Sequence, residues 1–486
     1  MKQSVLCNQG YIICKNEVTD IILKNIKKEL KVKPFIPGSR GKFAKGFKIY
    51  LENDIKLCLP KFYGLQKFGK PNLEDFGSSN DINLTFTGDL RDYQMNVINT
   101  VIPKIKNQEG GTISLPPGRG KTVIACKLIS ELKKKTLVIV HKTFLLNQWK
   151  NRIEQFLPDA KVGKIQAQEF DTVDKHIVIG MLQTLSLKDS HPDDIFDDFG
   201  CIIFDECHHL SAEKFSQILR KISVPYMIGL SGTPFRNDKL EKVFEYYIGG
   251  MLYYEKPSVK QEILVKTYKF DMKHEKFQIV FNKYTKEPQI ATMISNIVEL
   301  VERNKFLVGL IQECRENKAR KILVLSDRID HLNYMKDKVD ELDIGSTSKY
   351  VGGMKQEKLD SAEEADIIFS TYSMSSEALD ISSLNTIILS TSRRNVEQSV
   401  GRILRKQEGH LAQPLIIDIV DNLKVFVNQG YTRKSYYKKI TNIANMQTFS
   451  YEEGKIKETT PKIVNAIEDE DIKPSKDNLF ADSDSE

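Results

Sequence analysis

The hydrophobic and polar positions alternate along most of the chain between short apolar runs and longer stretches with helical spacing. From residue 89 onward, five runs rich in apolar residues each precede a helix-like stretch: "GTISL", "TLVIV", "HIVIG", "CIIFD" and "YMIGLSG". Continuous apolar runs predict strands buried on both faces, as in a parallel sheet covered by helices. The alternation resumes after residue 290 with "KILVLSD", "SKYVGG", "ADIIFST", "NTIILST" and "PLIIDIV". The sequence therefore predicts an α/β fold with two consecutive units of similar size.

Three segments depart from this alternation. Residues 1–88 mix short apolar runs with Gly and Pro, which predicts a small N-terminal α/β or α+β module. Residues 251–290 hold two strand-like runs, "EILVKTYKFD" and "QIVFNKYT", which indicate connecting strands or an inserted hairpin. Residues 426–486 begin as a Tyr/Lys-rich helix and end in an acidic stretch that we expect to be disordered. The predicted domains are 1–88, 89–250, 251–290, 291–425 and 426–486.

Composition and apolar patterning argue against a membrane-spanning or secreted protein. With 40% hydrophobic and 28% charged residues, the 486-residue chain has the balance of a globular protein with a large core. No apolar run approaches the roughly 20 residues needed to cross a membrane, and the N-terminus lacks the apolar segment of a secretory signal. The seven cysteines show no paired spacing, which predicts reduced thiols in an intracellular protein.

The net charge of +7 is unevenly distributed along the chain. Residues 1–80 carry 15 Lys/Arg against 7 Asp/Glu, a net charge of +8, whereas residues 468–486 carry a net charge of −6. A basic N-terminal module is compatible with nucleic-acid binding. A general preference of this chain for lysine explains the same excess equally well, so charge alone leaves the role of residues 1–88 open.

A glycine-rich loop joins the first apolar run to the helix that follows it, in "TISLPPGRGKTVIACKLI". Gly118 and Gly120 let backbone N–H groups surround a phosphate at a helix N-terminus. Lys121 can then reach the β- and γ-phosphates, and the Thr122 hydroxyl can bind Mg²⁺. The first glycine of the usual pattern is replaced by Leu115, but the strand–loop–helix context is retained. The predicted ATP-binding loop comprises Pro117, Gly118, Arg119, Gly120, Lys121 and Thr122.

Two acids end the apolar run "FGCIIFDE", at the strand edge where α/β proteins bind their ligands. We expect Asp205 to contact Mg²⁺ together with Thr122, and Glu206 to activate the attacking water. Zinc is the alternative, because Cys207 and two histidines follow at once. Structural zinc ligands are normally spaced about two to five residues apart, however, which favours Mg²⁺.

The single tryptophan, Trp149, lies on the helix predicted after "TLVIVH". We expect its indole ring to pack in the core against the sheet, and stacking on a nucleic-acid base is the alternative.

These motifs, in this order, resemble the superfamily 2 (DEAD/DEAH-like) helicases, motors with two RecA-like domains that act on DNA or RNA. In "LRDYQ", the resemblance implies that Gln94 recognises adenine. "LSGTP" is similar to the motif that links hydrolysis to movement, which implies that His208 bridges the hydrolysis site to Ser231 and Thr233.

Other motifs resemble segments that bind nucleic acid or complete the ATP site. "VHKTFLLNQW" and "GMLQTL" imply backbone contacts from Lys142, Gln183 and Thr184, and "STYSMSSEALDI" implies one from Thr371. The same second-unit motif implies that the nucleotide ribose lies near Glu377 and Asp380. Ala378 departs from the family pattern, which has glycine there.

The segment "QSVGRILR" resembles the motif that completes the hydrolysis site from the second unit. It implies catalytic roles for Gln398, Arg402 and Arg405. Arginines supplied from across a cleft stabilise the charge that develops on the γ-phosphate. Hydrolysis would therefore depend on closure of the two units.

Within the superfamily, the motifs look closest to XPB-like helicases, phage recombination helicases and the transcript-release helicases of poxviruses and other large DNA viruses. The resemblance implies an ATP hydrolase that uses ATP and Mg²⁺ and moves 3′-to-5′ on DNA, in viral transcription, replication or repair. The alternatives are an RNA helicase, and a DNA translocase or transcript-release factor without processive unwinding. A scaffold without hydrolysis is disfavoured because Lys121, Asp205 and Glu206 are intact.

The expected partners are DNA or RNA, and transcription or replication machinery. We expect no membrane association, and a location in the host cytoplasm or virion if the chain is viral. The sequence does not indicate an oligomeric state.

Overall fold

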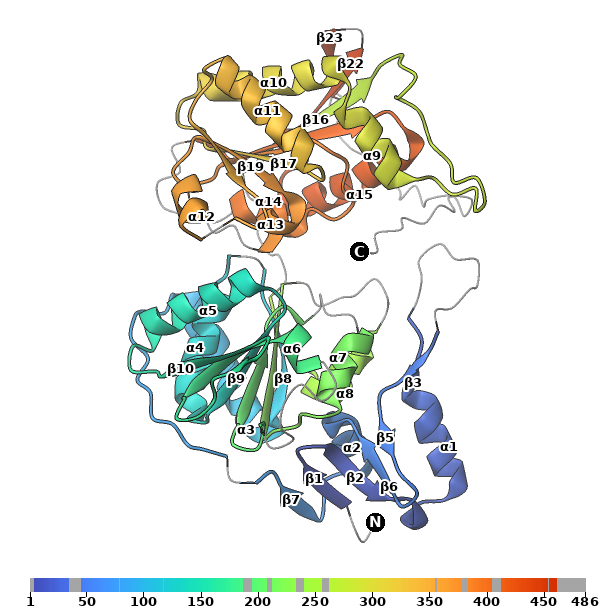
Figure 1. Ribbon diagram of the computed structural model, residues 1–486, viewed down its shortest axis with the longest axis vertical. Coiled ribbons are helices and arrows are strands. Elements are labelled where there is room, and N and C mark those ends of the chain that lie inside the picture. The colour runs from blue at the N-terminus through green and yellow to red at the C-terminus, as the bar shows by residue number, and fades with distance from the viewer. Residues whose placement is uncertain are drawn as a thin grey trace. The chain divides into compact units, whose positions relative to one another are not determined.

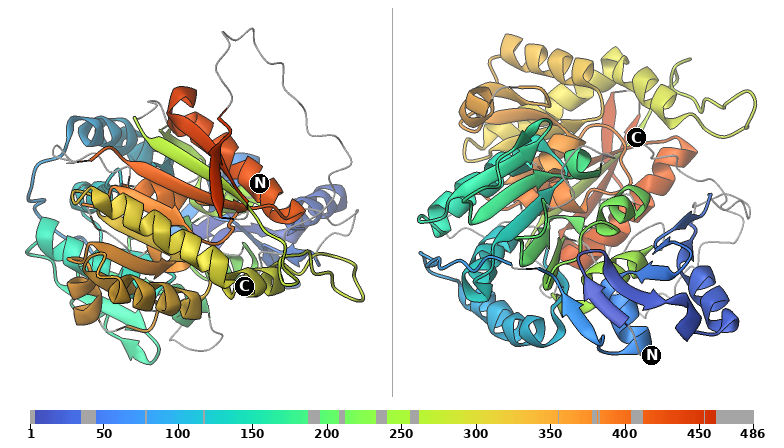
Figure 2. Two further views of the ribbon diagram at one scale, coloured as in Figure 1. Left: turned by 90° about the horizontal axis from the view of Figure 1, so that it is seen from above. Right: turned by 60° about the horizontal axis from the view of Figure 1, so that its bottom comes forward.

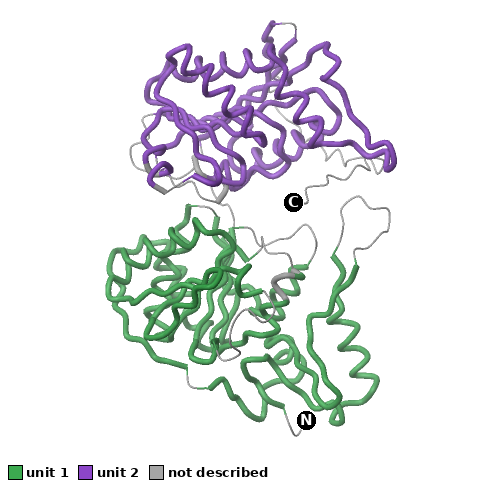
Figure 3. The backbone as a smooth tube through the Cα atoms, in the orientation of Figure 1, with its two compact units in different colours: residues 1–256 green, residues 257–486 purple. Residues whose placement is uncertain are grey.

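The chain divides into two compact units, residues 1–256 and 257–486 (Figure 3). The computed structural model describes residues 4–34, 45–77, 79–116, 118–186, 195–207, 212–232, 240–255, 262–354, 356–377, 381, 383–403, 412–452 and 454–460. Each unit contains one eight-stranded, mostly parallel sheet with helices packed on it (Figure 1), which confirms the predicted α/β class. Within the described ranges, every helix is too short or too polar to cross a membrane.

The large sheet of the first unit has the strand order β11-β10-β12-β9-β13-β14-β8-β15. All neighbours in it pair in parallel except β10 and β11. Its strands are β8 (Gly110–Ser114), β9 (Thr136–Val140), β10 (Val162–Gln166), β11 (Glu169–Phe170), β12 (Ile177–Met181), β13 (Cys201–Phe204), β14 (Tyr226–Ser231) and β15 (Met251–Tyr254). The five apolar runs predicted as strands from residue 89 onward are thus β8, β9, β12, β13 and β14.

Both faces of this sheet are buried, as its continuous apolar runs require. Along β9, Leu137 and Ile139 belong to one core cluster, and Val138 and Val140 belong to the other. The second of these clusters is completed by α3 (Asp92–Gln108), α4 (Lys121–Leu132) and α5 (Thr143–Phe156). The first is completed by α6 (Leu182–Ser186), α7 (Ala212–Leu219), α8 (Glu241–Ile248) and the N-terminal module.

The N-terminal module is a five-stranded sheet of order β5-β6-β2-β1-β7, fixed against the large sheet. Its anchor is Lys61, whose ammonium is buried and donates hydrogen bonds to the carbonyl oxygens of Val224 (3.2 Å) and Pro225 (2.7 Å). Glu109 balances the charge at 2.9 Å. The module consists of β1 (Ser4–Cys7), β2 (Gly10–Cys14), η1 (Lys15–Glu17), α1 (Asp20–Glu29), β3 (Lys31–Val32), β4 (Phe47–Lys48), β5 (Leu51–Glu52), β6 (Lys56–Leu59), α2 (Lys61–Phe68) and β7 (Leu73–Asp75).

The sheet of the second unit has the strand order β18-β19-β17-β20-β21-β16-β22-β23. Its strands are β16 (Leu264–Asp271), β17 (Ile322–Ser326), β18 (Thr347–Tyr350), β19 (Ile367–Thr371), β20 (Thr386–Leu389), β21 (Leu415–Asp421), β22 (Met446–Glu452) and β23 (Lys455–Glu458). The helical elements are α9 (Ile290–Val298), α10 (Val301–Glu316), α11 (Ile329–Glu341), α12 (Gln356–Ala362), α13 (Tyr372–Glu377), α14 (Glu397–Ile403), α15 (Lys424–Ile440) and η3 (Ile443–Asn445).

Of the two strands predicted within residues 251–290, the one over "EILVKTYKFD" is confirmed as β16, which lies in the interior of the second sheet and pairs in parallel with β21 and β22. The stretch also supplies β15 to the first sheet. The prediction of a strand over "QIVFNKYT" is wrong, because this segment makes only one bridge, between Phe281 and Pro288. Asn282 ends the extended run by accepting hydrogen bonds from the backbone of Tyr284 (2.9 Å) and Thr285 (3.2 Å), which forms a turn.

A buried polar network joins the helices of the second unit to its strands. Arg303 is fully buried on α10, and its guanidinium donates two hydrogen bonds to Asp421 at the end of β21 (2.6 and 3.0 Å). His331 on α11 contacts Ser326 through Nδ1 (3.0 Å) and Asn304 through Nε2 (3.1 Å). Burial, reinforced by the nearby Arg303 charge, lowers the pKa of His331 to about 3. The imidazole is therefore neutral in the folded second unit at physiological pH.

We expect acid to destabilise the second unit through His331. In the unfolded chain this imidazole takes up a proton near its ordinary pKa of 6.5, whereas in the folded unit it stays neutral down to about pH 3. Unfolding therefore binds a proton between these pH values, and stability falls with decreasing pH by at most ~1.4 kcal/mol per pH unit from this residue. Hydrogen exchange of peptides covering α11 measures the effect in the second unit alone.

The matched variant is His331→Gln, which keeps polar contacts without titrating. Compared at the same pH, its protection relative to wild type should increase as pH is lowered from about 7.5 to about 5. A constant ratio across this range would show that His331 is not held neutral by the fold.

Candidate active site

The phosphate loop connects β8 to α4, and two of its glycines adopt left-handed backbone angles. Gly118 has φ 79° and Gly120, the N-cap of α4, has φ 71°. The positive φ of Gly120 favours glycine, and a Cβ atom there would lie 2.3 Å from Nε2 of Gln94, so the end of that side chain would have to move. Thr122 follows half-buried on α4, while the predicted loop residue Pro117 lies outside the described residues.

An ion pair joins this loop to the acidic motif. The Lys121 ammonium lies 2.6 Å from Oε1 of Glu206, and the backbone N–H of Gly232 donates to Oε2 of the same carboxylate (3.0 Å). Strand order explains the convergence, because β14, which precedes Gly232, lies between β13 and β8. The carboxyl ends of three adjacent parallel strands thus meet at one carboxylate.

The other acid, Asp205, faces a different partner. It is 7% exposed, and its Oδ2 accepts a 2.7 Å hydrogen bond from Nε1 of Trp149 on α5. Burial, followed by the negative charge of Glu206, raises the pKa of the Asp205 carboxyl. The core packing expected for Trp149 is confirmed by its 1% exposure, but the hydrogen bond to Asp205 was missed. No motif signals it, since it depends on β9 and β13 being neighbours in the sheet.

Gln94 is placed beneath the phosphate loop. It is 5% exposed, its Oε1 accepts from the Arg91 backbone N–H (3.0 Å), and its Nε2 donates to the Arg119 carbonyl (3.5 Å). Its amide therefore supports the loop in this structure. Recognition of adenine by Gln94 stays a prediction.

Arg119 makes contacts that the sequence did not indicate. Its guanidinium lies 3.6 Å from the ring centroid of Tyr93 and donates two hydrogen bonds to Glu255, one of them 3.1 Å long. Glu255 directly follows β15 at the opposite edge of the sheet from β11. The phosphate loop is thereby fixed to the end of the first unit.

Two of the predicted nucleic-acid contacts lie together on the first unit. Gln183 on α6 is exposed, and its Nε2 donates to the carbonyl of His141 (2.6 Å), which precedes Lys142, the N-cap of α5. Thr184 differs, because it is 6% exposed and its hydroxyl accepts from the backbone N–H of Ala167 (2.9 Å). The Thr184 hydroxyl therefore binds the protein's own backbone in this structure. Lys142 and Gln183 are the more accessible candidates for contacts with nucleic acid.

The coupling and second-unit residues are only partly described. Ser231 is buried at the end of β14. In the second unit, Thr371 ends β19, and Gln398 is half-buried on α14, which is joined to α13 by a 2.9 Å contact between the hydroxyls of Ser375 and Ser399. Glu377 lies on α13 and Arg402 on α14, but their side chains are not described. The predicted residues outside the described parts of the chain are His208, Thr233, Asp380 and Arg405.

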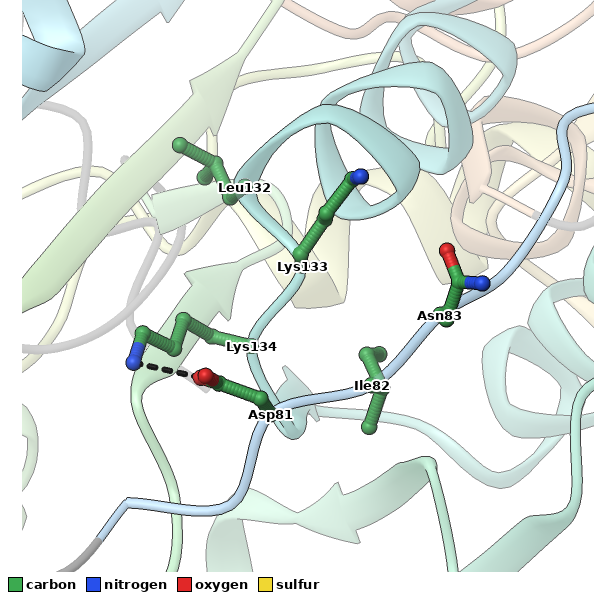
Figure 4. A pocket seen from close by; sticks show the side chains of 6 residues that line it. All are labelled: Asp81, Ile82, Asn83, Leu132, Lys133 and Lys134. Atoms are coloured by element: carbon green, nitrogen blue, oxygen red, sulfur yellow. Dashed lines mark hydrogen bonds and ion pairs between the residues drawn. The ribbon is translucent and has the colours of Figure 1, made fainter.

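A surface hollow lies at the other end of α4 from the phosphate loop (Figure 4). It forms where the segment after the N-terminal module crosses the base of the first sheet, and Lys134 pairs there with Asp81 at 2.6 Å. Its position excludes it as the nucleotide site. Its lining consists of Asp81, Ile82, Asn83, Leu132, Lys133 and Lys134.

Comparisons with known proteins agree with this geometry. Residues 87–236 match the family described as the res subunit of type III restriction enzymes. A protein of Acanthamoeba polyphaga mimivirus named as an ATP-dependent RNA helicase is 37% identical over 441 residues, which cover 88% of this chain and 84% of that protein. The DNA 3′-5′ translocase XPB2 of Sulfurisphaera tokodaii is 33% identical over 165 residues, or 34% of this chain and 35% of that protein.

Solved structures share the fold. The ATP-dependent type ISP restriction-modification enzyme LlaBIII, solved bound to DNA, is 15% identical with a TM-score of 0.54, over 76% of this chain and 32% of that chain.

The fold and the site define a nucleotide-dependent motor protein built on two RecA-like sheets. The chain belongs to the superfamily 2 helicases, where it is related to viral helicases and to the XPB group. It is therefore an ATP hydrolase of the nucleic-acid helicase class.

We expect the Trp149→Phe variant to need more Mg²⁺ for ATP hydrolysis, while the phenyl ring keeps most of the core packing. Loss of a hydrogen bond to a buried carboxylate should lower kcat at limiting Mg²⁺ by roughly tenfold or more and raise the Mg²⁺ concentration at half-maximal activity. ATPase assays across a Mg²⁺ titration measure both effects. Leu146→Val is the control, because it alters the same buried face of α5 at a side chain that has no hydrogen-bond donor for Asp205. An identical Mg²⁺ dependence in Trp149→Phe and wild type would exclude this role.

Proposed function

We propose that the chain is a Mg²⁺-dependent ATPase that moves 3′-to-5′ along DNA and uses this movement to unwind or remodel nucleic acid. The observation that carries the proposal is the convergence of Lys121, Glu206, Asp205 and Gly232 at the ends of β8, β13 and β14. The convergence supports the proposal, because ATP hydrolysis needs a cation for phosphate, a base for water and a carboxylate for metal close together.

The donor atoms at the site suit magnesium. Thr122 offers a hydroxyl and Asp205 a carboxylate, which are the hard oxygen ligands that Mg²⁺ prefers. When bound, Mg²⁺ would neutralise charge on the phosphate oxygens. The raised pKa of Asp205 fits this role, since a buried carboxylate without a cation is electrostatically costly and a divalent ion would offset that cost.

Glu206 has to change partner before it can activate water. In this structure its carboxylate is engaged by Lys121 and by Gly232. Phosphates that bind Lys121 would compete with the carboxylate for the ammonium. Binding of ATP would thus free Glu206 to accept a proton from the attacking water.

DNA is the favoured substrate because the XPB2 relative, 33% identical over 165 residues, acts on DNA by its name. RNA is the second candidate, because the mimivirus relative is named as an RNA helicase. We infer that the N-terminal module adds to nucleic-acid binding through its basic character. The viral relatives also favour a role in viral transcription or replication, inside the infected cell.

ATPase assays with single-stranded DNA, duplex DNA and RNA, titrated in parallel at one stated salt concentration, test the proposal. We expect the rate of ATP hydrolysis to increase with each nucleic acid that the protein binds, and most strongly with DNA. Hydrolysis that is indifferent to all three would contradict a motor function. If RNA alone stimulated hydrolysis, RNA and not DNA would be the substrate.

Glu206→Gln tests the chemical assignment. Removing the base should lower kcat by at least about 100-fold, while binding of a fluorescent ATP analogue persists, since Lys121 loses only its competing partner. Glu255→Gln serves as the control, because it changes a carboxylate near the loop that has no proposed role with water. Hydrolysis at the wild-type rate by Glu206→Gln would refute the assignment.

A further inference from the structure

A hairpin projects from the second unit between β16 and α9 and carries an aromatic residue at its tip. Figures 1 and 2 show this yellow-green segment extending beyond the helices and strands around it. Tyr284, at the tip, is 94% exposed, the highest value of any large hydrophobic side chain among the described residues. Phe281, nearer the base, is 52% exposed.

The hairpin backbone is held by its own hydrogen bonds. Asn282 donates its N–H to the Glu287 carbonyl (2.8 Å) and accepts at its own carbonyl from the Lys286 N–H (3.0 Å). Its side-chain Oδ1 accepts from the amides of Tyr284 and Thr285. One asparagine thus organises the whole turn, which presents the tyrosine ring on an ordered support.

The base of the hairpin is anchored in the core of the second unit. Phe277 is 8% exposed and meets Phe270 of β16 edge-on, with 6.0 Å between ring centroids. Gln289, just before α9, donates its N–H to the Val280 carbonyl (2.8 Å). The hairpin is therefore held at its base and at its turn, and the most exposed ring, that of Tyr284, lies at its tip.

The hairpin also leaves the sheet at a functional edge. It follows the carboxyl end of β16, and β16 and β19 belong to the same parallel array. Thr371, a predicted nucleic-acid contact, lies at the carboxyl end of β19. The two strands are separated by β21, β20 and β17, so about 19 Å of sheet lies between Thr371 and the root of the hairpin.

The chemistry of the tip matches single-stranded nucleic acid. An exposed ring contributes little to stability, but it offers a flat surface to an unpaired base, and base–aromatic stacking tolerates any sequence. Lys283 precedes Tyr284 and Lys286 follows it in the same turn, and both are exposed, so the turn offers two cationic groups to phosphates. A surface for a protein partner would instead present a broader apolar patch than one ring.

We propose that Tyr284 stacks on an unpaired base of single-stranded nucleic acid, with Lys283 and Lys286 contacting the adjoining phosphates. This inference rests on the proposed motor function and names an element that holds the single strand. The hairpin carries none of the residues proposed for ATP hydrolysis. Loss of the ring should therefore weaken the hold on the strand without lowering the rate of hydrolysis at saturating nucleic acid.

The test compares Tyr284→Ala, Tyr284→Phe and Tyr284→Trp with wild type in the full chain. Fluorescence anisotropy with labelled single-stranded DNA measures affinity, and a partial duplex with a 3′ overhang measures unwinding. We expect Tyr284→Ala to lower affinity and unwinding rate by about fivefold or more. ATPase kcat at saturating single-stranded DNA should stay at the wild-type value. Tyr284→Phe and Tyr284→Trp should retain both activities, because the ring and not the hydroxyl makes the contact.

Tyr431→Ala is the matched control, since that tyrosine on α15 is also largely exposed (63%) but lies outside the hairpin. If Tyr284→Ala binds and unwinds DNA as well as wild type does, the inference is overturned. The proposed function would still hold in that case, provided that DNA stimulates ATP hydrolysis by the wild-type protein. An equal loss in Tyr431→Ala, or failure of Tyr284→Phe to bind, would also overturn it. If wild-type hydrolysis does not respond to any nucleic acid, the motor function fails and this inference fails with it.

Discussion

The ion pair between the Lys121 ammonium and the Glu206 carboxylate connects the phosphate loop to the acidic motif, and Gly232 adds the end of a third strand. The partially buried setting strengthens this attraction relative to bulk water. In the proposed reaction the nucleotide phosphates need the same ammonium and would replace the carboxylate. Binding of ATP and release of the proposed base would then be a single exchange of partners. Until phosphate is present, the Glu206 carboxylate stays paired with Lys121.

The backbone of Glu206 makes this division of labour between neighbouring acids possible. Its φ of 46° is a left-handed angle, which costs a non-glycine residue about 1–2 kcal/mol. The turn directs Asp205 toward Trp149 and Glu206 toward Lys121. In an extended continuation of β13, successive side chains would instead point to opposite faces of the sheet. The interactions of both carboxylates offset the strain, which is typical of functional sites.

Sequence patterns predicted the parts of the fold that depend on local order. The run "TLVIV" is a strand because both of its faces are buried, and the phosphate loop follows from its glycines. Contacts that depend on strand order were not predictable: Trp149 reaches Asp205 only because β9 adjoins β13. The hydrogen bond from the Ala167 backbone N–H to the Thr184 hydroxyl was likewise not predictable, and the nucleic-acid contact of Thr184 stays a prediction. At Asn282, a hydrogen bond from the Tyr284 backbone to the asparagine side chain forms a turn within a segment whose sequence predicted a strand.

In the second unit, buried ion pairs hold an irregular segment that precedes α14, the helix that carries Arg402. The segment from Ser390 to Arg393 leads into α14, and two buried guanidinium groups hold it. Arg303 donates to the Ser390 carbonyl (2.7 Å), and Arg433 donates to the Arg393 carbonyl (2.6 Å). Each guanidinium is neutralised by an acid of β21, so removing one partner of such a pair would cost about 3–5 kcal/mol. Because ion pairs of this kind have fixed geometry, the helix that carries Arg402 starts from a rigid support. For the proposed role of Arg402 in ATP hydrolysis this support matters, because flexibility at the base of an arginine would cost entropy at each hydrolysis cycle.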